Sequence, residues 1–136
     1  LADAHPVVRR RVRDELQSEE DWEVCGEAAT GDEAVALTAV KHPDVVVLDL
    51  SMPQLNGLQA ARLIHERFPA IEMIILTMHD PLEMMDELKA VGVRAFIQKD
   101  DLHLLVDAIR EIFPQAQMSS ERPSSRRRKK PAIRAL

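Results

Sequence analysis

Residues 44–57 read Asp44-Val45-Val46-Val47-Leu48-Asp49-Leu50-Ser51-Met52-Pro53-Gln54-Leu55-Asn56-Gly57. Their four consecutive apolar residues, three of them β-branched, predict a central strand buried on both faces. The strand ends in the carboxylate of Asp49, at the edge where open α/β sheets bind ligands. An isolated carboxylate at such a point is as often a turn or helix-capping residue. The stretch therefore predicts a parallel α/β sheet and makes Asp49 a candidate functional residue.

Strands and helices are predicted to alternate along the first 113 residues. The expected strands are residues 22–28, 45–48, 72–77 and 95–98, and residues 1–3 read as the last part of a strand whose beginning is missing. The expected helices are residues 6–18, 30–42, 58–68, 81–91 and 100–113. This order predicts a doubly wound, five-stranded parallel sheet with a truncated first strand and helices on both faces. We also expect the chain to be a fragment of a longer protein.

Charge divides the chain into two parts. The whole chain is 46% hydrophobic and 30% charged, which is typical of a folded globular protein. Residues 1–113 carry 11 Lys/Arg and 22 Asp/Glu, whereas residues 114–136 carry 7 Lys/Arg and 1 Asp/Glu. The second part has no apolar periodicity and contains the basic run 126–130, so we predict a folded domain over 1–113 and a basic, disordered tail or linker over 114–136. Deleting residues 117–136 is expected to leave thermal stability nearly unchanged.

The cysteine content and hydropathy point to a cytoplasmic protein. Cys25 is the only cysteine, which excludes an internal disulfide and suits a reducing compartment. No apolar run approaches the roughly 20 residues that a transmembrane helix needs. We therefore expect a cytoplasmic protein with no membrane partner.

Four polar residues each close a predicted strand: Asp3, Asp49, Thr77 and Lys99. Taken singly, each is more often a cap or a surface residue than a functional group. The carboxyl ends of parallel strands share one edge, so the four side chains are expected to converge on one crevice. Two carboxylates, a hydroxyl and an ammonium fit phosphoryl chemistry with Mg²⁺. The histidines His5 and His79 flank this edge, but without Cys or His partners at ligand spacing we do not expect a transition metal.

Short motifs add a resemblance to a known family. Ala2-Asp3-Ala4-His5-Pro6, Leu48-Asp49-Leu50-Ser51-Met52-Pro53, Leu76-Thr77 and Gln98-Lys99-Asp100 match, in order and approximate spacing, the receiver domain of bacterial response regulators. Two of the motifs have residue sequences that resemble those of the NarL/FixJ-type subfamily: His5-Pro6-Val7-Val8-Arg9 and Met52-Pro53-x-x-Asn56-Gly57. The resemblance covers about residues 1–113 and implies a (βα)5 flavodoxin-like receiver fold in two-component signal transduction.

The resemblance also implies a role for each strand-end residue. Asp49 would accept a phosphoryl group from a phosphohistidine on a partner histidine kinase. Lys99 would pair with the phosphoryl charge, and the Thr77 hydroxyl would hydrogen-bond a phosphoryl oxygen. Phe96 matches the aromatic residue that turns inward during the family's switch, and it reads equally well as an ordinary core residue.

The same resemblance implies a Mg²⁺ site with one departure. The carboxylates of Asp3 and Asp49 and the backbone carbonyl of Ser51 match the positions that hold the metal in the family. The family usually has two adjacent acids after its first strand, and here Ala4 takes the place of the second, which ligates the metal directly. We therefore expect Mg²⁺ binding, and with it the phosphorylation rate, to be weakened or lost.

Three functions can be weighed on this sequence. The leading one is a phosphoaccepting signalling module, not an enzyme, whose switch controls transcription. Its alternative is a receiver-like interaction domain that Ala4 has made unresponsive to phosphate. An aspartyl-phosphate hydrolase would need a second acid two residues after Asp49, where the chain has Ser51, so we reject it. Expected partners are a sensor histidine kinase and a second copy as a homodimer. DNA would be bound through an output domain outside this chain, or weakly through the basic tail.

Overall fold

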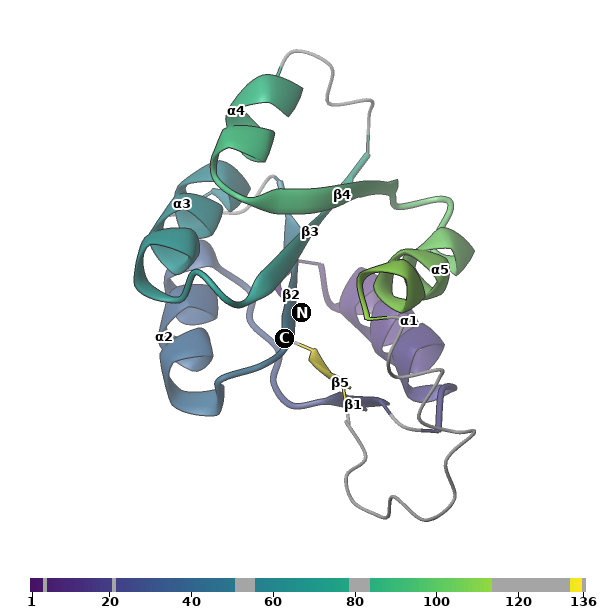
Figure 1. Ribbon diagram of the computed structural model, residues 1–136. Coiled ribbons are helices and arrows are strands. Elements are labelled where there is room, and N and C mark those ends of the chain that lie inside the picture. The colour runs from purple at the N-terminus through teal and green to yellow at the C-terminus, as the bar shows by residue number, and fades with distance from the viewer. Residues whose placement is uncertain (4, 21, 51–55, 79–83, 114–132, 136) are drawn as a thin grey trace.

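A parallel sheet forms the centre of the computed structural model, which describes all residues except 4, 21, 51–55, 79–83, 114–132 and 136 (Figure 1). The strands are β1 (Trp22–Val24), β2 (Val45–Asp49), β3 (Glu72–Thr77), β4 (Val93–Gln98) and β5 (Ile133–Ala135). Their order across the sheet is β1-β5-β2-β3-β4, and all neighbouring pairs are parallel.

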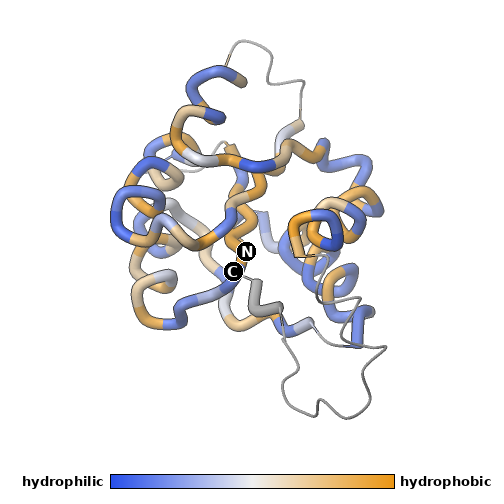
Figure 2. Tube along the Cα trace, viewed as in Figure 1, coloured by the Kyte–Doolittle hydropathy of each residue, from blue (hydrophilic) through white to orange (hydrophobic). Residues whose placement is uncertain are grey.

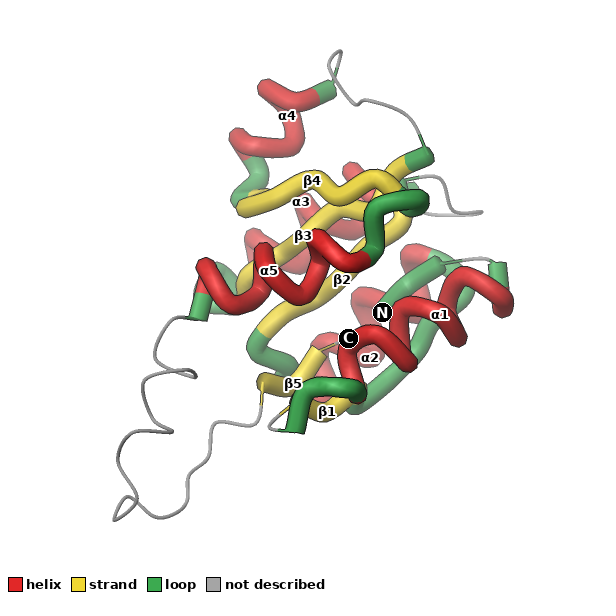
Figure 3. The backbone as a smooth tube through the Cα atoms, turned by 90° about the vertical axis from the view of Figure 1, so that its right-hand side faces the viewer, coloured by secondary structure: helices red, strands yellow, loops and turns green. Residues whose placement is uncertain are grey.

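Helices cover both faces of this sheet, as Figures 1 and 3 show from two directions. One face carries α1 (Pro6–Gln17) and α5 (His103–Ile112). The opposite face carries α2 (Gly31–Lys41), α3 (Gly57–Arg67) and α4 (Met85–Ala90). The predicted doubly wound parallel sheet is therefore confirmed. Among the described residues, no helix is long and apolar enough to cross a membrane.

The two central strands divide their side chains between two hydrophobic clusters. In β2, Val46 and Leu48 pack toward α2 and α3, whereas Val45 and Val47 pack toward α1 and α5. All five residues of β2 are buried, as the run of β-branched residues predicts for a strand covered on both faces. Figure 2 shows the same concentration of apolar residues along β2 and β3. Because β2 is packed on both faces, the polar groups at the carboxyl edge of the sheet are attached to a rigid element.

The beginning of α3 is placed by a close backbone contact with Asp49 and by a helix cap. Gly57 begins α3, and a Cβ at this residue would lie 2.4 Å from the backbone oxygen of Asp49, so only glycine fits. Asn56 caps the helix: its side chain accepts a hydrogen bond from the Gln59 amide at 2.9 Å, and the Gln59 side chain accepts one from the Asn56 amide at 3.1 Å. The first turn of α3 is thereby held against the end of β2.

The C-terminal segment differs from its prediction. Residues 114–136 were expected to make no contact with the domain, but Ile133–Ala135 form β5 and pair with β1 and β2 inside the sheet. The expectation that the whole segment is a free tail is wrong for these three residues, and so is the reasoning that its deletion costs no stability. A strand this short shows no periodicity, and its neighbours are far away in sequence. Residues 114–132, with the basic run, lie outside the described part, and their disorder stays a prediction.

Candidate functional site

Four polar side chains are buried at the carboxyl edge of the sheet. Asp3 is 0% exposed, Asp49 2%, Thr77 5% and Lys99 8%. Asp49 ends β2, Thr77 ends β3, and Lys99 directly follows β4. The Lys99 amide donates to the Thr77 carbonyl at 2.8 Å, which keeps these two strand ends together. Charged side chains are rarely buried unless they are paired, so the charged groups at this edge are expected to interact with one another.

Lys99 joins the two carboxylates. Its Nζ atom lies 2.7 Å from Oδ2 of Asp3 and 3.0 Å from Oδ1 of Asp49. Burial lowers the pKa of Lys99, but the hydrogen bonds and charges of Asp3 and Asp49 outweigh it and hold the pKa above its ordinary value of 10.5. Lys99 is therefore an ammonium at neutral pH. With both acids ionised, the three side chains carry one net negative charge, which suits a cation.

Asp3 is placed by the backbone on both sides of it. The Ala2 amide donates to the Val47 carbonyl at 2.8 Å, and the Asp49 amide donates to the Ala2 carbonyl at 2.7 Å. On the other side, the Asp3 amide donates to the Ala28 carbonyl at 3.0 Å. These bonds seat residues 1–3 between the end of β2 and the chain beyond β1. The two aspartates consequently lie on neighbouring strand ends, as the sequence predicts.

Two further residues hold Asp3 and were not identified from the sequence in this role. The Oδ1 atom of Asp3 accepts a hydrogen bond from the His5 backbone amide at 2.9 Å and lies 3.1 Å from His5 Nδ1. The Arg9 guanidinium donates to the Asp3 backbone carbonyl at 2.6 Å. Arg9 also pairs with Glu27, whose carboxylate forms an ion pair with Arg13 as well. Arg9 lies one helical turn after His5, and that spacing alone could have suggested its position.

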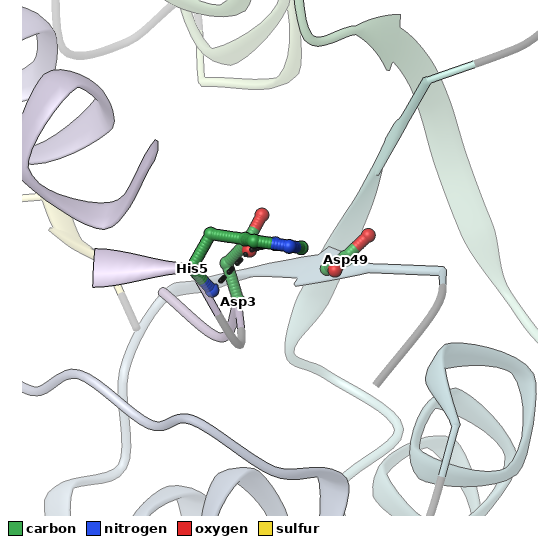
Figure 4. A group of neighbouring side chains, drawn as sticks. All are labelled: Asp3, His5 and Asp49. Carbon is green, nitrogen blue, oxygen red and sulfur yellow. Dashed lines mark hydrogen bonds and ion pairs between the residues drawn. The ribbon is translucent and has the colours of Figure 1, made fainter. Parts of the chain in front are cut away.

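A cluster of possible metal ligands lies at this edge (Figure 4). One ligand atom each from Asp3, His5 and Asp49 can be chosen so that all three lie within 4.8 Å of one another. Opposite ligands of an octahedral Mg²⁺ ion lie about 4.2 Å apart, twice the usual bond length, so small side-chain movements would bring both carboxylates into range. Carboxylate oxygens are the ligands that Mg²⁺ prefers. The described residues therefore fit a divalent, oxygen-seeking cation.

The remaining predicted residues have different outcomes. Phe96 lies on β4, half-buried, and packs against the cluster beneath α2, α3 and α4. That position fits both an inward-turning switch residue and a core residue, so its role stays a prediction. Ser51 and Ala4 lie outside the described residues, as does His79. The backbone-carbonyl ligand and the missing second acid therefore remain predictions.

Comparison with known proteins points to one family. The family described as the response regulator receiver domain matches residues 1–110. The transcriptional regulatory protein YhcZ of Bacillus subtilis is 39% identical over 100 residues, covering 74% of this chain and 47% of that protein. The oxygen regulatory protein NreC of Staphylococcus haemolyticus is 39% identical over 116 residues, which cover 83% of this chain and 53% of that protein. The chain thus spans about half the length of the curated relatives it matches.

Solved structures agree with this family. A two-component response regulator of the LuxR family from Aurantimonas has a TM-score of 0.78 and 32% identity, covering 84% of this chain and 82% of that one. The receiver domain of the response regulator NarL from Mycobacterium tuberculosis has a TM-score of 0.74 and 26% identity, and the match covers 85% of this chain and 92% of that one. The fold and its buried acidic edge are those of a signalling domain. The chain belongs to the response regulator receiver family, and its relatives are regulators of the NarL and LuxR kind.

Proposed function

We propose that Asp49 is the phosphoacceptor of this receiver domain and that a sensor histidine kinase supplies the phosphoryl group. The observation that carries this proposal is the 3.0 Å contact between the buried Asp49 carboxylate and Lys99 Nζ at the end of the central strand. A nucleophile fixed at this edge, with an ammonium beside it, is arranged for in-line attack on a phosphoryl group. The protein supplies position and charge neutralisation.

The transfer moves one phosphoryl group between two residues. A carboxylate oxygen of Asp49 forms a bond to phosphorus as the phosphorus–nitrogen bond of the kinase phosphohistidine breaks, and the imidazole leaves with its electron pair and later takes a proton. Lys99 then pairs with the phosphoryl oxygens. Thr77, whose carbonyl accepts the Lys99 amide, would donate its hydroxyl to a phosphoryl oxygen. The product is an acyl phosphate on Asp49.

A Mg²⁺ ion would be held by Asp3, Asp49 and the Ser51 carbonyl. Bound there, the ion would supply positive charge for the phosphoryl oxygens and fix their orientation. Ala4 removes a direct ligand, so we propose that this chain binds Mg²⁺ more weakly than a receiver with two adjacent acids. Asp3 compensates in part because Arg9 and the His5 amide hold it at the site.

The output is proposed to be transcriptional control. Two curated relatives are described as the transcriptional regulatory protein DegU of Brevibacillus brevis and the DNA-binding transcriptional activator DevR/DosR of Mycobacterium tuberculosis. By analogy, phosphorylation of Asp49 would draw Thr77 inward, turn Phe96 and change the surface offered to a DNA-binding output domain or a second copy of the chain. The setting would be the cytoplasm, where kinase and DNA are both accessible. The alternative of an interaction domain unresponsive to phosphate is not favoured by the family match.

A small-molecule acyl phosphate donor tests the proposal without the unidentified kinase. Intact-mass measurement should show one added phosphoryl group in the presence of Mg²⁺ and much less after chelation. Treatment with hydroxylamine should remove the added mass, because an acyl phosphate reacts with it whereas a serine or threonine phosphate ester does not. A mass gain that resists hydroxylamine would contradict a carboxylate acceptor.

A further inference from the structure

His5 brings an imidazole to the acidic edge from the beginning of α1. Within that helix, whose residues are all described, the His5 side chain makes no capping hydrogen bond, and its Nδ1 atom lies 3.1 Å from Oδ1 of Asp3 instead. Figure 4 shows the side chain extending across Asp3 toward Asp49. One ligand atom from each of the three residues lies within 4.8 Å of the other two. The proposed phosphoryl transfer gives this imidazole no task.

The backbone on both sides of His5 limits where its imidazole can lie. Pro6 follows it, and a residue before proline is confined to extended conformations, in agreement with the φ of -97° and ψ of 115° at His5. The His5 amide donates to Oδ1 of Asp3 at 2.9 Å, and the Arg9 amide donates to the His5 carbonyl at 3.0 Å. The main chain of His5 is therefore fixed relative to Asp3, and only the side-chain torsions remain to be set.

The distance from His5 Nδ1 to Asp3 Oδ1 suits two neighbouring ligands of one ion. In an octahedral complex with bonds of about 2.1 Å, neighbouring ligand atoms lie about 3.0 Å apart, close to the 3.1 Å found here. The other oxygen of Asp3, Oδ2, lies 2.7 Å from Lys99 Nζ, so the two oxygens of this carboxylate face different partners. An ion could therefore bind Oδ1 of Asp3 while Oδ2 keeps its contact with Lys99.

The donors at this edge discriminate between divalent cations. Residue 4 is alanine and has no donor atom in its side chain, so residues 3–5 supply one carboxylate and one imidazole. Mg²⁺ binds oxygen ligands and gains little from an imidazole, whereas first-row transition metals accept imidazole nitrogen. The His5 side chain is 70% exposed, so binding through it costs little desolvation and leaves the outer side of the ion open to water. The imidazole therefore adds affinity for transition metals and little for Mg²⁺.

We propose that Nδ1 of His5 is a metal ligand beside the carboxylates of Asp3 and Asp49, so that this edge prefers a first-row transition cation to Mg²⁺. Nδ1 would bind through its lone pair, with the ring proton on Nε2. The expectation from sequence that no transition metal binds counted only Cys and His partners, and the structure supplies two carboxylates in their place. The inference rests on the proposed metal site at Asp3 and Asp49, and it does not require Asp49 to be phosphorylated.

Calorimetric titration with Mg²⁺, Mn²⁺ and Co²⁺ separates a ligand from a residue that only supports the structure. His5→Ala should leave Mg²⁺ affinity within about twofold, weaken Mn²⁺ binding about tenfold and weaken Co²⁺ binding more, following the order in which these ions favour nitrogen. His5→Asp exchanges the nitrogen for an oxygen ligand and should shift the preference toward Mg²⁺. Equal losses for all three ions in His5→Ala, or no loss for any, would overturn the proposal.

His42→Asn is the control for the removal of a histidine. His42 is exposed and precedes β2 at the end opposite Asp49, and its φ of 49° is one that asparagine tolerates. The affinities of this variant for the three ions should match those of the parent chain. A loss of Co²⁺ affinity in His42→Asn equal to that in His5→Ala would place the transition metal away from the acidic edge and overturn the proposal.

Pulsed electron paramagnetic resonance of Mn²⁺ tests the contact directly. With less Mn²⁺ than protein, the bound ion should show coupling to an imidazole nitrogen in the parent and in His42→Asn, and none in His5→Ala. Absence of that coupling in the parent would overturn the proposal. Asp3→Asn should weaken binding of all three ions. If it does so while His5→Ala changes nothing, only this inference fails; if Asp3→Asn also changes nothing, the proposed metal site fails with it.

Discussion

The Nζ atom of Lys99 lies 3.0 Å from the Oδ1 atom of Asp49, and both side chains are buried. Lys99 also lies 2.7 Å from Asp3, so one ammonium neutralises part of the charge of two carboxylates. Removing one partner from a buried ionic cluster leaves charge uncompensated and is strongly destabilising. The contact therefore links the stability of the domain to the proposed chemistry of the site.

The first prediction concerns Lys99. Lys99→Met should lower the free energy of unfolding by about 3 kcal/mol in the absence of divalent cations, because two buried carboxylates would face each other without it. Added Mg²⁺ should recover part of the loss by binding the same carboxylates. Urea unfolding with and without Mg²⁺ measures both effects. The exposed Lys89→Met is the matched control and should change stability little; equal losses in the two variants would refute a charge effect at the site.

The second prediction concerns Gly57. Its Cβ position lies 2.4 Å from the Asp49 backbone oxygen, so Gly57→Ala must push α3 away from the end of β2. We expect a loss of about 2 kcal/mol or more in unfolding free energy and slower phosphorylation of Asp49. Asn56→Ala, which removes the neighbouring cap without filling that space, should cost only about 1 kcal/mol. If Gly57→Ala proves the milder of the two, the close approach to Asp49 does not constrain the position of α3.

The third prediction concerns Ala4, which lies outside the described residues. Ala4→Asp should tighten Mg²⁺ binding about tenfold to a hundredfold, since it restores a carboxylate ligand. Without metal, the added carboxylate should lower the melting temperature, because it would repel Asp3 and Asp49. Calorimetric titration and melting with and without Mg²⁺ measure these opposite effects. Equal affinity in the two proteins would show that residue 4 does not face the metal.

Much of the fold follows from local sequence. The run Val45–Leu48 can only be buried on both faces, and the polar residues that end successive strands must meet at one edge of a parallel sheet. For that reason Asp3, Asp49 and Lys99 were correctly expected to converge.

The features that sequence could not supply are non-local. β5 has only three residues, and its two partners are 90 or more residues away in the chain, so no periodicity marks it. The contact of Arg9 with the Asp3 carbonyl depends on how α1 leaves the sheet. The Arg9 contact holds Asp3, which is one of the proposed Mg²⁺ ligands. Sequence pattern identified the chemical groups, whereas tertiary pairing explains how they are held.

Phosphorylation of defined variants tests the central claim most directly. With an acyl phosphate donor and Mg²⁺, the parent chain should gain one phosphoryl group, Asp49→Asn should gain none, and Asp3→Asn should gain it more slowly. The exposed Asp86→Asn is the control and should match the parent. Full phosphorylation of a folded Asp49→Asn variant would contradict the assignment of Asp49 as the phosphoacceptor.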